Sequence, residues 1–323
     1  MGRAIRLSGV DIFHGLSNEL SADIGHTRAR SVVTMHDIIF VHHPELYKPA
    51  DRWLYTRKYS RSCRNADRII AISRQTAGDL VNYWHVPEEK IAVVYQGCDP
   101  AFEKTVGEKQ RREVRAAYGL PERYILSVGT IEERKNLMLT VRAMVAGKLD
   151  IDLVACGRHT RYADRVMEYA AAHGIGSRVR MLHSVPFSDL PALYQMASVF
   201  VYPSFYEGFG IPIVEALSAG VPVIASIGSC LEEAGGEHSI YVDPDDVEGM
   251  ANAMKKVLAD EHLRREMIEK GKEYVVRFDP KTLADEMNAV YLKCFDDKTF
   301  TEDRFVQTSS NKRTKISHYL PFF

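Results

Sequence analysis

The stretch VFVYPSFYEGFGIPIVEALSAGVPVIA, Val199–Ala225, decides the fold. Its pattern predicts a strand, a tight glycine loop, a helix and a second strand, in that order. Gly208 and Gly210 permit backbone conformations that a side chain would forbid. Pro212 suits the first turn of a helix, where its missing N–H costs nothing. A strand that leads through a glycine loop into a helix N-terminus favours anion binding, because the free backbone N–H groups point at the ligand.

Two glutamates frame this loop, Glu207 within it and Glu215 in the helix, with seven residues between them. A carboxylate would repel a phosphate, so we expect both to accept hydrogen bonds from hydroxyl groups. Phosphate and hydroxyls together indicate a nucleotide that carries a sugar. For either glutamate alone, a surface position on a capped helix is the alternative interpretation.

Strand-like apolar runs alternate with helical patterns along the chain, which predicts parallel α/β sheets. The expected strands are 10–13, 31–35, 68–72, 91–95, 124–128, 152–155, 179–182, 199–202, 221–225 and 240–242. The expected helices are 51–66, 73–84, a segment ending near 145, 213–219, 247–258, 263–275 and 282–294. In open α/β sheets ligands bind beyond the carboxyl ends of the strands, and the candidate site residues follow those ends.

A polar run over Asp99–Arg112 predicts a linker between two domains. We therefore expect a first domain over residues 1–105 and a second over 106–277. A helix over 278–295 is expected to pack back toward the first domain. Residues 296–323 predict a loosely ordered tail, whose aromatic end HYLPFF could instead dock on a partner or on the protein.

Composition excludes several classes of protein. The chain has 323 residues, enough for two α/β domains, and its net charge of −1 argues against a nucleic-acid partner. Five scattered cysteines without a CxxC indicate reduced thiols and a cytoplasmic protein, without disulfides or a zinc site. No apolar run approaches the ~20 residues of a membrane span. The arginine-rich segment Arg52–Arg68 is either a solvated helix face or a peripheral contact with anionic lipid at the inner membrane face.

The string EGFGIPIVEALSAGVPVIAS resembles the signature of retaining glycosyltransferases of family four, whose paired glutamates follow an E-x7-E spacing. The resemblance extends over about Val10–Cys294. The strings FHGLSNEL, HDIIF, PELYKP and YQGC are most similar to bacterial mannosyltransferases. The resemblance to family four implies the GT-B fold, with two Rossmann-like parallel-sheet domains that face each other across a cleft. The implied reaction moves a hexose, expected to be mannose from GDP-mannose, to a glycan or lipid-linked acceptor in cell-surface polysaccharide biosynthesis.

The resemblance also implies roles for residues of the central stretch. Glu207 would face the transferred sugar and is the expected catalytic residue of this domain. Glu215 would bind the ribose hydroxyls of the donor. The backbone N–H groups of Phe209, Gly210 and Ile211 would meet the sugar and the diphosphate.

Arg134 and Lys135, in GTIEERKNL, are the expected cations for the diphosphate, because Arg grips two oxygens and Lys supplies a point charge. An isolated pair of this kind would be a solvated surface pair. Many relatives carry Arg directly after the glycine of this loop, where this chain has Thr130. Glu132 and Glu133 are expected to be solvated or bound to neighbouring backbone.

His36, in TMHDIIF, resembles the family histidine that reaches the donor sugar from the first domain, and is the second expected catalytic residue. His14, in FHGLSNE, is expected to line the acceptor side. For a lone histidine after a strand, a structural role is the alternative. The donor base is expected near His183, Ser184 and Val185, mostly through their backbone.

No metal or other cofactor is expected, since the donor loop has no Asp-x-Asp motif and the family generally needs no divalent ion. In the family the departing diphosphate takes the acceptor proton, and the paired glutamates are not a glycosidase acid and nucleophile.

Relatives of this type begin with a further strand, a glycine-rich loop and additional βα elements, so the first domain is expected to be truncated. A catalytically weak or inactive nucleotide-sugar-binding protein, and another enzyme of the same fold, stay open as alternatives.

Overall fold

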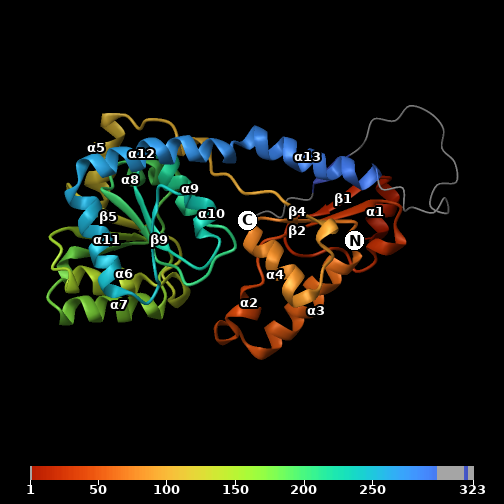
Figure 1. Ribbon diagram of the computed structural model, residues 1–323, viewed down its shortest axis with the longest axis horizontal. Helices are drawn as coiled ribbons and strands as arrows, with labels where there is room; N and C mark the ends of the chain where they lie inside the picture. The colour runs from red at the N-terminus through yellow and green to blue at the C-terminus, as the bar shows by residue number, and fades with distance from the viewer. Residues whose placement is uncertain (1, 297–315, 319–323) are drawn as a thin grey trace. The chain divides into compact units, whose positions relative to one another are not determined.

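The computed structural model describes residues 2–296 and 316–318, and their contacts divide the chain into two compact units (Figure 1). The first unit comprises Met1–Gln96 and Pro280–Phe323, and the second comprises Gly97–Asp279. Each unit is built on its own parallel sheet. The predicted α/β class, with parallel sheets, is therefore confirmed.

The sheet of the first unit has five strands in the order β11-β1-β2-β3-β4. These strands are β1 (Ile12–Gly15), β2 (Arg30–Met35), β3 (Arg68–Ala71), β4 (Ile91–Val93) and β11 (Ile316–His318). The helices of this unit are α1 (Gly2–Ser8), α2 (Ile39–His42), α3 (Pro49–Asn65), α4 (Arg74–Trp84) and α13 (Pro280–Asp296). Short 3₁₀ turns lie at Ile24–His26, Pro44–Leu46 and Glu88–Lys90.

Both faces of this sheet are covered, as the alternation of side chains along its strands requires. Val32 of β2 packs with Tyr291 of α13 in one apolar cluster. The next residue, Val33, points to the opposite face and packs with Cys63 of α3 and Leu80 of α4. Helix α13 therefore belongs to the core of the first unit although it is the last helix that the structure describes.

The sheet of the second unit has six strands in the order β10-β9-β8-β5-β6-β7. These strands are β5 (Tyr124–Val128), β6 (Asp152–Cys156), β7 (Val179–Leu182), β8 (Val199–Tyr202), β9 (Val223–Ser226) and β10 (Ile240–Val242). The helices are α5 (Glu108–Tyr118), α6 (Leu137–Ala146), α7 (Arg161–Ala172), α8 (Leu190–Gln195), α9 (Ile211–Ser218), α10 (Leu231–Gly235), α11 (Val247–Ala259) and α12 (Glu261–Val275). Further 3₁₀ turns lie at Pro100–Phe102, Glu133–Lys135, Gly176–Arg178, Phe187–Asp189 and Val276–Phe278.

The second unit is doubly wound. Helices α6, α7 and α11 cover one face of its sheet, and α8, α9 and α12 cover the other (Figure 1). The strand order reverses between β5 and β8, which are neighbours in the sheet. A reversal of this kind leaves a crevice at the carboxyl ends of the two strands, where α/β proteins bind ligands.

All ten predicted strands are present, with ends displaced by up to two residues. The prediction of a linker throughout Asp99–Arg112 is wrong, because α5 begins at Glu108. Val114 is the one buried residue of this helix, so the segment lacks the apolar periodicity by which a helix is predicted from sequence. Residues 97–105, predicted to belong to the first domain, group with the second unit, since Phe102 is fully buried and packs edge-on against Tyr194.

The predicted tail, 296–323, lies largely outside the described residues. Within it, Ile316–His318 form β11, which runs parallel to β1 with Ile316 opposite Ile12. For these three residues the expectation of a loosely ordered chain is wrong. Among the described helices, none has both the length and the apolar character needed to cross a bilayer.

Candidate functional site

The glycine loop after β8 leads into helix α9 at the strand-order reversal. Gly210 is the N-cap residue of α9 with φ = 118°. This conformation favours glycine, and a Cβ at this position would in addition crowd Leu231 Cδ2 at 3.1 Å. At the other end of α9, Gly220 has φ = 74° and its N–H donates to Leu217 O at 3.0 Å. Gly220 is therefore the C′ residue of α9, a position that favours glycine.

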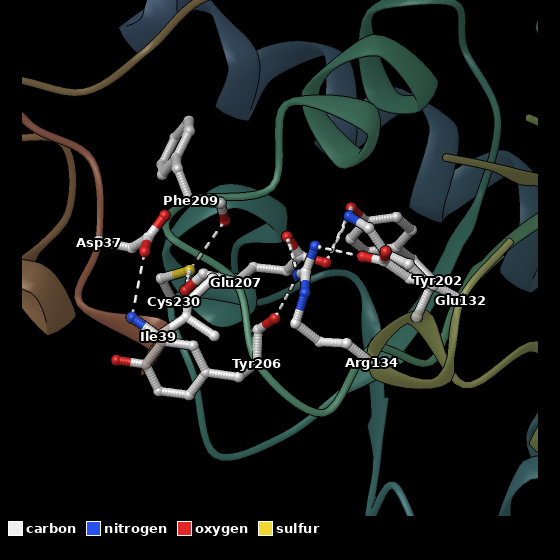
Figure 2. A network of polar contacts seen from close by, with 10 residues as sticks. Asp37, Ile39, Glu132, Arg134, Tyr202, Tyr206, Glu207, Phe209 and Cys230 are labelled. Atoms are coloured by element: carbon white, nitrogen blue, oxygen red, sulfur yellow. Dashed lines mark hydrogen bonds and ion pairs between the residues drawn. The ribbon is translucent and has the colours of Figure 1, made fainter. Parts of the chain in front are cut away.

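Glu207, in the same loop, binds both predicted diphosphate cations (Figure 2). Its side chain is buried, with Oε1 2.5 Å from Lys135 Nζ and Oε2 2.8 Å from Arg134 Nη1. The Tyr202 hydroxyl accepts a hydrogen bond from Lys135 Nζ at 2.5 Å and donates to Glu207 Oε1 at 3.2 Å. The structure therefore brings these predicted site residues together and adds Tyr202, which the sequence pattern assigned only to a strand.

Main-chain contacts tie the two loops to each other. The Phe205 N–H donates to Arg134 O at 2.9 Å, and Arg134 Nη1 donates to Tyr206 O at 2.7 Å. Asn136, which follows the cationic pair, adopts φ = 53° and caps helix α6. The loop after β5 is thereby fixed against the loop after β8, with Arg134 and Lys135 facing Glu207.

The charges of this cluster determine its protonation. Burial alone would raise the pKa of Glu207, but the charges of Lys135 and Arg134 outweigh burial and lower it. Burial also lowers the pKa of Lys135, and Glu207 opposes this shift. For Arg134 burial would lower the pKa, yet the charge of Glu207 raises it, so the guanidinium stays charged. The cluster thus holds a carboxylate between two half-buried cations.

The two acids beside the cationic pair are bound differently from expectation. Glu132 Oε1 lies 2.9 Å from Arg134 Nη2, so this carboxylate is ion-paired with a side chain of the site. Glu133 is largely exposed, as expected, and also pairs with Arg165. The expectation that these acids are solvated or bound to neighbouring backbone therefore fits the exposed Glu133 but not Glu132, which pairs with Arg134.

Glu215, on helix α9, is held by a residue that sequence reasoning missed. Its Oε2 accepts a hydrogen bond from the Tyr194 hydroxyl at 2.7 Å. Burial raises the pKa of Glu215, and the hydrogen bond from Tyr194 opposes that shift. Tyr194 itself is fully buried on α8 and packs against Phe102 and Phe200. From the sequence, this tyrosine in a largely apolar helix indicates no more than a core residue.

The side chain of Cys230 contacts the backbone of the glycine loop. The Cys230 thiol lies 3.1 Å from the carbonyl oxygens of both Glu207 and Phe209 (Figure 2). Among residues 2–296 and 316–318, none accepts a hydrogen bond from the N–H of Gly210 or Ile211. These two donors at the start of α9 are the predicted partners of the diphosphate and sugar.

The predicted base-binding segment follows strand β7. His183 is exposed, and its Nδ1 donates to Gly157 O at 2.7 Å. Ser184 is also exposed and adopts φ = 58°, and Val185 is half-buried. The segment lies at the carboxyl edge of the sheet of the second unit, at the end of its outermost strand β7.

The two predicted histidines of the first unit differ in burial and in how many of their ring nitrogens have hydrogen-bond partners. His36 is half-buried, and its Nε2 donates to Leu16 O at 2.8 Å, since a carbonyl can only accept. His14 is 1% exposed, with Nδ1 2.8 Å from the Tyr291 hydroxyl and Nε2 2.8 Å from Thr34 Oγ1. Both ring nitrogens of His14 are engaged inside the unit. Its position therefore does not support a place on the acceptor side, whereas His36 stays a candidate.

Within the described part of the chain, no group of three or more His, Cys, Asp or Glu side chains is arranged to hold a metal ion. The predicted absence of a metal requirement stays a prediction.

The second unit is thus a doubly wound α/β domain with a glycine loop, a cationic pair and two acids at its strand-order reversal. Residues 110–274 match the model of the family "Glycosyl transferases group 1", and residues 1–102 match that of "Glycosyltransferase Family 4". The first match covers half of the chain, so the chain belongs to the group 1 glycosyltransferases of family 4.

A curated relative agrees with this assignment, and two solved structures share the fold. The chain is 32% identical over 260 residues to the O-antigen chain mannosyltransferase B of Escherichia coli. That match covers 78% of this chain and 66% of the relative, so the chain spans slightly less than two thirds of it.

Among solved structures, a glycosyltransferase from Rickettsia africae ESF-5 has a TM-score of 0.77 at 18% identity, over 92% of this chain and 80% of that chain. Anabaena Alr3699/HepE in complex with UDP-glucose has a TM-score of 0.70 at 19% identity, over 82% and 72%. At these identities the likeness shows the fold alone, and it confirms the predicted GT-B class.

Proposed function

We propose that this chain is a retaining glycosyltransferase that moves a hexose, specifically mannose, from a nucleotide diphosphate sugar. The proposed acceptor is a glycan or a lipid-linked glycan of a cell-surface polysaccharide. The observation that carries the proposal is the cluster of Glu207, Arg134 and Lys135 beside the N-terminus of α9. It places cations, backbone donors and a carboxylate at the strand-order reversal, where a nucleotide sugar needs them.

Arg134 and Lys135 are proposed to bind the diphosphate together with the N–H groups of Phe209, Gly210 and Ile211. Glycosyl transfer develops negative charge on the departing diphosphate, and preorganised cations and donors stabilise that charge. Glu207 is ion-paired with both of these cations. The entering diphosphate would take over these cations and leave oxygens of Glu207 to accept hydrogen bonds from the sugar hydroxyls.

Glu215 is proposed to bind the ribose of the donor. Tyr194 occupies Oε2 of this carboxylate, so Oε1 is the oxygen that we assign to a ribose hydroxyl. The backbone of His183, Ser184 and Val185 is proposed to lie beside the base. His36 is proposed to reach the donor sugar from the first unit, through the Nδ1 that the contact with Leu16 leaves available.

Mannose is proposed because the curated relative is an O-antigen mannosyltransferase and because the FHGLSNEL and YQGC strings resemble such enzymes. GDP-mannose is accordingly the proposed donor. UDP enters the test because a protein of the same fold binds UDP-glucose.

The first test is a thermal shift with GDP, UDP and ADP on the wild type, on Glu215→Ala and on the control Glu168→Ala. Glu168 is an exposed acid of α7 in the same unit. A ligand at about a hundred times its dissociation constant adds roughly 2.7 kcal/mol of stability. We expect GDP to give this shift in the wild type and in the control, and Glu215→Ala to lose most of it.

Mannosyl transfer from GDP-mannose to a lipid-linked acceptor then tests the activity itself. Binding without turnover on any acceptor would favour the alternative, a nucleotide-sugar-binding protein without transferase activity. If none of the three nucleotides raises the melting temperature of a wild type that unfolds cooperatively, the proposal of a donor site is wrong.

A further inference from the structure

The first unit contains a pocket of about 560 Å³ between helices α2, α3 and α4. Four aromatic side chains and two guanidinium groups contribute to its lining: Phe40, Trp53, Tyr83, Trp84, Arg52 and Arg57. In the part of the chain that the structure describes, no acidic side chain lines it. The volume is in the range of small-molecule sites, and the lining combines apolar walls with positive charge.

Arg52 supplies a donor without a matching acceptor. Its Nε is buried, and among the described residues none accepts a hydrogen bond from it. A buried N–H of a charged group costs stability unless an acceptor reaches it. Because Arg52 lines the pocket, an oxygen-bearing anion in the pocket would satisfy this donor.

Arg57 adds a second cation at the same place. Its guanidinium lies over the ring of Trp53, with 5.5 Å to the ring centroid, and its side chain is exposed. Other basic residues of α3 are engaged elsewhere, since Lys58 pairs with Glu19 at 3.1 Å and Arg61 donates to Ala22 O at 2.7 Å. The pocket therefore gathers Arg52 and Arg57 with no acid in its lining, and the nearby Glu45 interacts with Arg52 from outside the lining.

Apolar side chains surround these cations on the surface. Trp53 is 63% exposed and Tyr83 is 49% exposed, and Leu54 is a further exposed apolar residue of α3. Helix α3 carries five basic residues against the single acid Asp51, although the whole chain has a net charge of −1. Exposed aromatic side chains such as these favour the headgroup level of a membrane, and clustered Arg is attracted to an anionic membrane surface.

We propose that this pocket binds the phosphate of an anionic phospholipid, with Arg52 and Arg57 on the phosphate and Trp53 and Tyr83 in the interfacial layer. The positive charge of the pocket complements the negative surface of such a membrane. The site lies wholly within the first unit, and the proposal does not depend on the donor site of the second unit.

The test is co-sedimentation of the full chain with phosphatidylcholine vesicles, with and without phosphatidylglycerol, at physiological salt. We expect binding only to the anionic vesicles. A basic residue near such a surface contributes roughly a fivefold change in partitioning, so Arg52→Gln and Arg57→Gln should each weaken binding at least about fivefold. The matched control is Arg64→Gln, which removes the same charge from an exposed position of α3 outside the pocket.

The outcomes separate the pocket from general electrostatic attraction. Equal losses in Arg57→Gln and Arg64→Gln would overturn the pocket, as would failure to bind anionic vesicles. Arg57 is exposed, so its variant tests the proposal even if Arg52→Gln does not fold. Stabilisation by inorganic phosphate that depends on Arg52, without vesicle binding, would overturn the lipid in favour of a small phosphate ligand.

Discussion

At the scale of single residues, Glu207 stabilises the fold only while it is ionised. Its pKa is lowered in the folded chain, because Lys135 and Arg134 together outweigh the effect of burial. A carboxyl with a lowered pKa contributes stability above its unfolded pKa, which is about 4.3. That contribution is lost as the pH falls through the lower folded pKa. Both cations are half-buried, so they depend on this carboxylate as an ion-pair partner.

We therefore predict that Glu207→Gln destabilises the chain by about 3 kcal/mol at pH 7, since it leaves two partly buried cations without their shared partner. Thermal melts of both proteins between pH 3 and 7 check this. The difference should shrink below about pH 4. Glu168→Ala serves as the control. A constant difference across this pH range would contradict the assignment.

Tyr194 is the residue through which Glu215 is positioned. Tyr194→Phe removes the hydrogen bond to Oε2 and leaves the aromatic packing in place. Because that bond opposes the effect of burial, its loss should raise the pKa of Glu215 further. We predict weaker binding of the nucleotide, by roughly tenfold for one lost hydrogen bond to a charged group.

The pH dependence distinguishes positioning from a general loss of structure. The affinity for GDP should fall, as the pH is lowered, at a higher pH in Tyr194→Phe than in the wild type. Tyr118→Phe is a matched control, since its hydroxyl donates to Asp189 at a different place in the unit. Isothermal titration at several pH values gives the two curves, and coincident curves would refute the role of Tyr194.

At the scale of elements, the loop between β8 and α9 depends on one glycine. Gly210 combines φ = 118° with a neighbour 3.1 Å from its Cβ position. We predict that Gly210→Ala costs about 1–3 kcal/mol and abolishes the GDP-dependent thermal shift. Gly228→Ala is the control, because Gly228 also has a positive φ of 85° but no atom within 4 Å of its Cβ position. Equal effects would mean that backbone strain alone, not the packing of the loop, matters.

The same loop shows what could be predicted from the sequence. Gly210, Pro212 and Gly220 restrict the backbone locally, so the strand, loop and helix were predictable from short-range rules. The contact between the Phe205 N–H and Arg134 O joins residues far apart in the chain, and no local pattern specifies it. Tyr194 shows the same limit, since a buried tyrosine in an apolar helix carries no sign of its hydroxyl partner.

At the scale of the whole molecule, the sequence pattern predicted two parallel α/β sheets. It placed the boundary between the two units too late in the chain. Phe102 lies in a polar stretch, and only its burial against Tyr194 shows that this stretch packs with the second unit. Helix α13 packs on the sheet of the first unit through Val290 and Tyr291. Each unit therefore has its own apolar core, which is the condition for independent folding.

This separation of cores leads to a prediction about the donor site. The fragment Gly97–Asp279 contains the glycine loop, the cationic pair and both glutamates. We predict that it folds alone and keeps a GDP-dependent stabilisation of about 2.7 kcal/mol at a hundred times the dissociation constant. It should lose transferase activity, because His36 belongs to the first unit. Calorimetry of the fragment and of the full chain measures folding and stabilisation by GDP, with Glu215→Ala in the fragment as control. The transfer assay with GDP-mannose measures the activity. A folded fragment that does not bind GDP would show that the first unit contributes to nucleotide binding.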